Sequence, residues 1–135
     1  METTLRWIKG HQFVAEDGDG GAIVIDARGD DGAKAGFKPT ALLLASLGAC
    51  AAYDVVDILR KQRQDLRGMR IQVEGDQEPD PPWPFTRFRL RFELSGRGLD
   101  AEKARRAVDL AVTKYCAVVA SLKAPVETEI ALLET

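Results

Sequence analysis

The hydrophobic and polar positions of the chain follow two periods, one typical of helices and the other of strands. The densest apolar pattern spans residues 39–64, where Leu43, Leu47 and Cys50 recur at helical spacing on one face. We expect one long helix there, with Thr40 as its N-cap, because a threonine hydroxyl accepts hydrogen bonds from the free N–H groups of a first turn. A helix of this length crosses a whole domain of this size or packs against a second chain.

Apolar and polar residues alternate in several shorter segments, and each of these is predicted to be a strand. The clearest is residues 85–95, which places Phe88 and Phe92 on one side and Arg89 and Arg91 on the other. One face of this strand is therefore expected to be buried and the other wet. The other expected strands are residues 4–7, 12–15, 22–26, 69–74 and 126–133.

A second helix is expected to begin after Asp100, which suits an N-cap, and to carry an apolar stripe that ends at Tyr115. Residues 117–122 are predicted to add a short helical turn before the closing strand. Since no internal repeat and no second hydrophobic centre is visible, we expect one domain over residues 1–135. Its fold class is α+β, with a long central helix, antiparallel sheets and a second helix.

Composition and charge restrict the class of partner. The chain has 135 residues, 45% of them hydrophobic and 30% charged, as in a soluble globular protein. Its net charge of −2 comes without a sustained basic patch, which argues against nucleic acid as a partner. The longest apolar run, residues 41–47, is broken by Ser46 and Gly48 and is far shorter than the roughly 20 residues of a membrane span. We therefore expect no membrane partner and, since the N-terminal residues do not form a secretory signal, a cytoplasmic protein.

The residues available for chemistry are two cysteines, Cys50 and Cys116, and one histidine, His11. Their spacing matches no metal site, because structural zinc sites cluster four ligands in short pairs. A cysteine on an apolar helix is either a small buried side chain or a nucleophile, and both interpretations are open for each cysteine. A cysteine hydrolase that pairs His11 with a thiol is a further alternative, although no third orienting group is identifiable.

Reactivity at Cys50 would require a nearby cation. The residue lies too far inside the expected helix for the helix dipole to stabilise a thiolate. Asp54, one turn further on, raises the thiol pKa unless a cation neutralises it. The candidate cations are Arg28, Lys34 and Lys38, which lie in the glycine-rich segment before the helix.

Three stretches of the chain resemble the OsmC/Ohr family of osmotically inducible and organic hydroperoxide resistance proteins. They read PTALLLASLGACAAYDVVDILRKQR, FTRFRLRFELSGRGLD and AVDLAVTKYCAVVASL. The resemblance covers nearly the whole chain, and its most specific part is the pair of cysteines, one in a small-residue helix and one in a late Tyr-Cys motif. It implies an intertwined α+β homodimer, with the two long helices packed together and two equivalent sites at the subunit interface.

The same resemblance implies the role of each cysteine. Cys50 is the expected peroxidatic residue, which attacks an organic hydroperoxide and becomes a sulfenic acid, and Cys116 is the resolving residue, which condenses with it to a disulfide. A dithiol such as dihydrolipoamide reduces that disulfide in the family. No cofactor and no metal is implied. The implied partners are a second copy of the chain, the hydroperoxide and the dithiol.

The chain departs from the family pattern near the start of the long helix. Ohr-type members carry a glutamate shortly after the helix-opening proline, paired with an activating arginine, and here Thr40 and Ala41 stand in its place. Arg28 is the match for the arginine, and Asp54 is the expected substitute for the carboxylate. Residues 54–59 fit a less characterised OsmC-like branch. The missing glutamate leaves a second hypothesis open, a non-enzymatic dimeric module that binds a hydrophobic or thiol ligand in the interface cavity.

Overall fold

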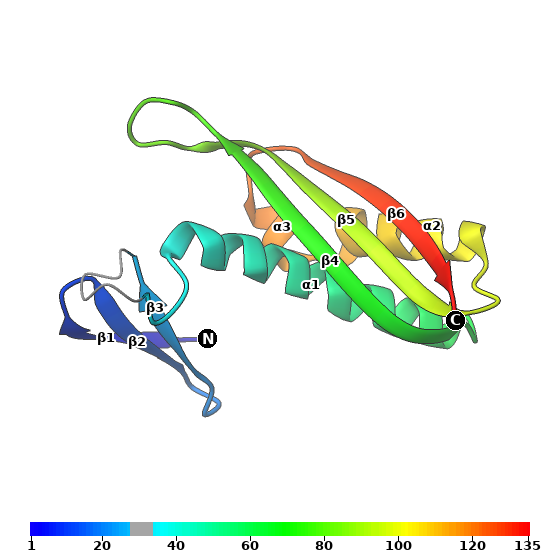
Figure 1. The fold of residues 1–135 in the computed structure, drawn as a ribbon, viewed down its shortest axis with the longest axis horizontal. Helices are drawn as coiled ribbons and strands as arrows, with labels where there is room; N and C mark the ends of the chain where they lie inside the picture. The colour runs from blue at the N-terminus through cyan, green and yellow to red at the C-terminus, as the bar shows by residue number, and fades with distance from the viewer. Residues whose placement is uncertain (28–33) are drawn as a thin grey trace. The chain divides into compact units, whose positions relative to one another are not determined.

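The computed structural model describes residues 1–27 and 34–135 (Figure 1). These residues form two compact units, Met1–Leu43 and Leu44–Thr135, and each has its own three-stranded sheet. The 23-residue helix α1 (Pro39–Lys61) begins in the first unit and continues in the second. The single domain expected over the whole chain stays a prediction.

The first unit contains an antiparallel meander, as the alternation predicts. Its strands follow in the order β1 (Thr3–Lys9), β2 (Gln12–Asp17) and β3 (Ala22–Asp26). The Asp17 carboxylate stabilises the turn between β2 and β3, because it accepts hydrogen bonds from the N–H groups of Asp19 (2.9 Å) and Gly21 (2.7 Å). Leu5 and Trp7 of β1 are 58% and 65% exposed, so this sheet leaves apolar surface uncovered.

The second unit has a mixed sheet. Its strands lie side by side in the order β4 (Asp65–Gln77), β5 (Phe85–Arg97) and β6 (Val126–Glu134). β4 and β5 are antiparallel, but β6 runs parallel to β5, with Phe88 paired to Val126 and Phe92 to Ile130. The sheet therefore differs from the expected antiparallel arrangement at β6. The reason is that the chain crosses from the end of β5 back to its start through a helical segment, as a parallel pair requires.

Helices cover one face of this sheet, as Figure 1 shows for α1 and for α2 (Ala101–Leu110). α2 continues into a π-helical turn, η1 (Ala111–Tyr115), and the short helix α3 (Ala117–Ser121) follows. Asp100 caps α2 as predicted, since its side chain accepts hydrogen bonds from the N–H groups of Glu102 and Lys103.

The core lies between β5 and the helices, on the side of β5 that its alternation predicts. The buried side chains are Phe88, Leu90, Phe92 and Leu94 of β5, Leu47, Ala51, Val55 and Leu59 of α1, and Ala104, Ala107, Val108 and Ala111 of α2 and η1. Each of the larger ones contributes about 1.5–3 kcal/mol by leaving water. Gly48 lets α1 approach β4 closely, because a Cβ at this position would lie 2.8 Å from Val73 Cγ2.

Three local expectations differ from the structure. α1 begins at Pro39, so Thr40 lies inside the first turn and is not the cap; proline suits the first helical position because an N–H group there would have no partner. β4 begins at Asp65 rather than at residue 69, and Gly68 lies inside the strand, next to a bulge. Tyr115 is 52% exposed, because the π-helical turn changes which residues continue the buried stripe of α2.

By length and composition, α1 is one helix that could cross a membrane, with a mean hydropathy of 1.8 in its most apolar window. The core helix of a soluble protein passes the same test, and Leu47, Val55 and Leu59 of α1 belong to the core. The length of the apolar run at residues 41–47 therefore understated the mean hydropathy of this helix. Only 28% of that window is buried within the chain, so much of α1 is left for contacts outside it.

Candidate active site

α1 presents different side chains on the two flanks of its buried face. The buried face runs through Leu47, Ala51 and Val55. On a helix of about 3.6 residues per turn, Cys50 falls on one flank of that face and Ala45 on the other. Cys50 is half-buried. The sulfur is thus neither a fully enclosed core group nor a freely exposed one.

Cys116 lies at the junction between η1 and α3, where its backbone and its sulfur both have partners. Its N–H group donates to the Ala111 carbonyl at 2.9 Å, and its Sγ accepts from the Val119 N–H group at 3.4 Å. Cys116 is therefore the N-cap of α3, and the residue is only 3% exposed. The π-helical turn before it is an irregularity often found at functional sites.

The Cys50 and Cys116 side chains lie beside each other in the second unit. Burial raises the pKa of the Cys116 thiol, the Val119 N–H group lowers it, and Cys50 raises it again as a hydrogen-bond partner and as a charge. No basic side chain of the described residues contributes to this shift. Because its pKa is raised, Cys116 keeps its proton at neutral pH. The two predicted cysteines thus lie next to each other.

The other two predicted site residues do not join the pair by any observed contact. Asp54 lies one turn beyond Cys50 and is half-buried, and its carboxylate forms no hydrogen bond or ion pair with another residue that the structure describes. Arg28 lies outside the described residues. The alternative cations Lys34 and Lys38 belong to the first unit, whereas Cys50 belongs to the second.

His11, the base of the alternative hydrolase, belongs to the first unit, and both cysteines belong to the second. In the described ranges, 1–27 and 34–135, no three His, Cys, Asp or Glu side chains lie close enough together to hold a metal ion. The chemistry that the described residues offer is that of two adjacent thiols.

A cavity of about 420 Å³ lies on one side of Cys116. Its walls come from η1, from α3 and from the segment that leads into β6. Residues that line it include Val112, Cys116, Val119, Ala120, Leu122 and Pro125. Cys50 does not line it. Sequence reasoning missed this cavity, because helical spacing relates positions 112, 116 and 120 but says nothing of the return of the chain through Pro125.

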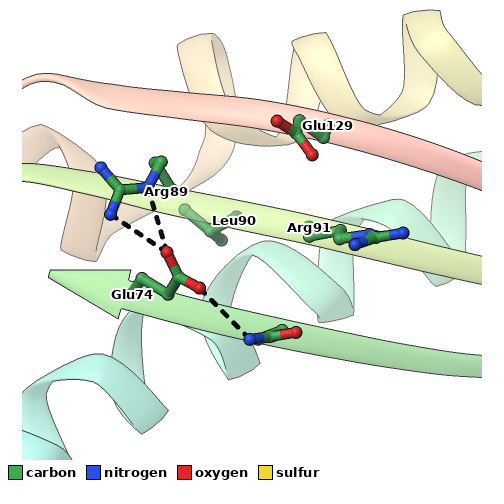
Figure 2. A pocket seen from close by; sticks show the side chains of 6 residues that line it. Glu74, Arg89, Leu90, Arg91 and Glu129 are labelled. Atoms are coloured by element: carbon green, nitrogen blue, oxygen red, sulfur yellow. Dashed lines mark hydrogen bonds and ion pairs between the residues drawn. The ribbon is translucent and has the colours of Figure 1, made fainter.

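The wet face of the sheet carries a cluster of charged side chains, and Figure 2 shows the pairing of Arg89 with Glu74 within it. The Arg89 guanidinium donates to Asp76 Oδ2 at 2.9 Å and to Glu74 Oε2 at 3.1 Å, and it holds the pKa of Asp76 below its usual range. The hollow beside this cluster measures about 230 Å³ and is also lined by Arg91 and Glu129. These charges largely pair with one another on the side of the sheet away from the helices. We interpret this face as a solvated surface.

The fold and the thiol pair define a class of α+β proteins. In this class a cysteine on a long central helix, here Cys50, lies next to a cysteine that follows a second helix, here Cys116. The chain belongs to the OsmC-like protein family, whose family model matches residues 29–131. This match confirms the resemblance that the cysteine motifs predict.

Individual relatives agree with this assignment. The chain is 34% identical to protein YhfA of Escherichia coli K12 over 123 residues, which cover 91% of this chain and 90% of YhfA. The crystal structure of an OsmC-like protein from Mycoplasma pneumoniae matches with a TM-score of 0.83 at 19% identity, covering 98% of this chain and 96% of the other. The organic hydroperoxide resistance protein OhrB of Bacillus subtilis matches with a TM-score of 0.63 at 20% identity and the same coverage. These two structures support the α+β fold.

Proposed function

We propose that the protein is a thiol-dependent peroxidase that reduces organic hydroperoxides in defence against oxidative stress. The observation that carries this proposal is the position of Cys50 beside Cys116. Two adjacent thiols are what a peroxidase needs in order to convert a sulfenic acid into a disulfide without large rearrangement. Membership of the OsmC-like family supports the same chemistry.

In the proposed reaction, the Cys50 thiolate attacks the terminal oxygen of a hydroperoxide, and the O–O bond breaks. The alcohol leaves with a proton, and Cys50 becomes a sulfenic acid. The Cys116 sulfur then attacks the Cys50 sulfur, water leaves, and a disulfide forms. A dithiol of the dihydrolipoamide kind supplies the two electrons and two protons that restore both thiols.

The surroundings of the two sulfurs support this division of roles. Cys50 is half-buried and therefore the more accessible sulfur for a hydroperoxide, whereas Cys116 is buried and has a raised pKa. A protonated, enclosed thiol is protected against direct oxidation until a sulfenic acid forms beside it. We assign Arg28, by resemblance to the family, as the cation that activates Cys50. We assign Asp54 as the substitute for the family glutamate that this chain lacks.

We further propose a cytoplasmic homodimer. Small residues of α1 and apolar residues of β4 line a groove of about 280 Å³, which includes Ala45, Ala49 and Ala52. Tyr53 of α1 is 76% exposed, as are large parts of Leu5 and Trp7. Apolar surface on this scale is typical of an interface rather than of a solvated face.

Peroxide consumption tests the proposal. The wild-type chain should consume cumene hydroperoxide with dihydrolipoamide as reductant. The Cys50→Ser variant should lose this activity, and the Cys116→Ser variant should complete one turnover and then accumulate oxidised Cys50. Ser46→Ala, an exposed change on the same helix, is the control and should keep full activity. Full activity in Cys50→Ser would refute the proposal.

One observation favours a second candidate, a non-enzymatic module that binds a hydrophobic or thiol ligand. The first turn of α1 contains no acidic residue, so the carboxylate that activates Ohr-type members is missing from Thr40 and Ala41. This candidate predicts that hydroperoxide leaves both thiols reduced. Thiol titration after peroxide treatment, with Cys50 and Cys116 separated by peptide mapping, distinguishes the two candidates.

A further inference from the structure

The reaction of the two thiols with a hydroperoxide assigns no role to the cavity beside Cys116. One residue of the pair, Cys116, lines it, and Cys50 does not. The hydroperoxide is expected at Cys50. A cavity lined by Cys116 and not by Cys50 is therefore positioned for the other half of the cycle, the reduction of the disulfide.

We propose that this cavity is the entry site for the reducing dithiol and that the dithiol attacks Cys116 rather than Cys50. The inference rests on the proposed function, because it requires a Cys50–Cys116 disulfide. It identifies a binding site for the reductant within one chain and the sulfur at which reduction begins.

The step follows the usual course of thiol–disulfide exchange. A thiolate of the reductant enters the cavity and bonds to the Cys116 sulfur, the Cys50–Cys116 bond breaks, and Cys50 leaves as a thiolate. The second thiol of the reductant then attacks the mixed disulfide, so the reductant leaves as its own cyclic disulfide and Cys116 takes up a proton. Two electrons pass from the dithiol to the protein disulfide.

Two features favour attack at Cys116. The attacking thiolate needs a route toward the sulfur that it attacks, and of the two cysteines only Cys116 lines the cavity. A thiol with a raised pKa is also a slow leaving group. Attack on Cys116, in which Cys50 leaves, should therefore be faster than attack on Cys50, in which Cys116 leaves.

The walls of the cavity indicate the class of reductant. Most side chains that line it are aliphatic, among them Val112, Val119, Leu122 and Pro125, and one cationic side chain, Lys114, is present. An aliphatic chain that carries two thiols gains contact with such walls, whereas a strongly charged peptide thiol would lose hydration without an equivalent partner. The aliphatic dithiol of the proposed function meets this condition.

Trapping the mixed disulfide tests the site directly. The protein is oxidised with diamide, so the disulfide is obtained whether or not the protein reacts with hydroperoxides, and it is then treated with 6-mercaptohexanol, an aliphatic monothiol that cannot complete the second step. After acid quenching, peptide mass spectrometry should locate the adduct on Cys116. An adduct on Cys50 would overturn the inference. If hydroperoxide forms no disulfide in a parallel sample, the proposed function fails independently.

Filling the cavity gives a second measurement. Ala120→Phe adds a ring at a lining position that is exposed, so the chain should still fold, and Ser121→Phe is the matched control on the same helix outside the lining. Ala120→Phe should slow the reduction of the disulfide by dihydrolipoamide by about tenfold or more, since misplacing a reacting group has effects of this size. Oxidation by diamide should be unchanged. Equal reduction rates in both variants would contradict the cavity as the entry site.

Discussion

Cys50 of α1 lies beside Cys116 at the start of α3, and each is held by a different part of the second unit. α1 rests on β4 through Gly48, and Cys116 is held by its hydrogen bonds to Ala111 and Val119. Neither sulfur therefore depends on a flexible segment for its position relative to the other. The proposed disulfide would therefore join two positions that the packed core already holds in place.

The raised pKa of Cys116 should appear in its reactivity. In the reduced wild-type protein, alkylation of Cys116 by iodoacetamide should become fast only above the ordinary thiol value of about 9, because burial and Cys50 both favour the neutral thiol. In Cys50→Ala, one of those causes is removed, so the midpoint should move to lower pH. Peptide mass spectrometry across pH 7–11, a range of roughly two units on either side of that value, measures it. An unchanged midpoint in the variant would show that the two thiols do not interact.

The elements of the second unit could largely be predicted from local patterns. The alternation of Phe88, Leu90 and Phe92 defines the buried face of β5, because successive strand residues point to opposite faces. Asp100 was identifiable as a cap because its side chain acts on residues two and three positions away. Such features depend only on neighbouring residues.

Features that depend on distant residues could not be predicted in this way. The alternation in β6 indicates a strand, but the parallel pairing with β5 is set by the path of the chain through α2 and α3. Nothing in the spacing of Cys50 and Cys116 indicates that they meet, and only the family motifs supported that expectation. The cavity beside Cys116 is formed by segments that come together only in the folded chain.

Gly96 should tolerate no side chain. It lies in β5 next to the bulge in β4, and a Cβ there would lie 2.1 Å from the Asp65 carbonyl oxygen, which belongs to the backbone and cannot move aside. Gly96→Ala should therefore lower the free energy of unfolding by about 1–3 kcal/mol or more. Gly18→Ala is the control, because nothing lies within 4 Å of the added Cβ. Urea titration followed by circular dichroism measures both, and equal midpoints would refute this account of Gly96.

The Asp76 carboxyl should titrate at lower pH than an ordinary aspartate. Arg89 donates to it and favours its charged form, so the stabilising contribution is present above the ordinary value of 3.8 and is lost as the pH falls through the lowered pKa. In Arg89→Gln the pKa should return toward its usual range. Arg91→Gln is the control, because Arg91 forms no ion pair among the described residues (Figure 2). Carboxyl NMR shifts between about pH 2 and 6 measure the titration, and an unshifted Asp76 in the wild type would contradict it.

The groove that small residues of α1 form with β4 should be the dimer contact. Ala49 is exposed and lines this groove, and only 28% of the most apolar part of α1 is buried within one chain. Ala49→Glu would bury an unpaired carboxylate at the interface and should raise the dimer dissociation constant about a hundredfold, or about 3 kcal/mol.

Ala101→Glu is the matched control for Ala49→Glu, since it adds the same charge at an exposed alanine in the first turn of α2, where an acidic residue is favourable. Sedimentation velocity at micromolar concentration should give a dimer for the wild type and for Ala101→Glu, and a monomer for Ala49→Glu with unchanged circular dichroism. A wild-type monomer would rule out the dimer. A dimeric Ala49→Glu would mean that the chains meet through another surface, and the apolar side of α1 would then require a different partner.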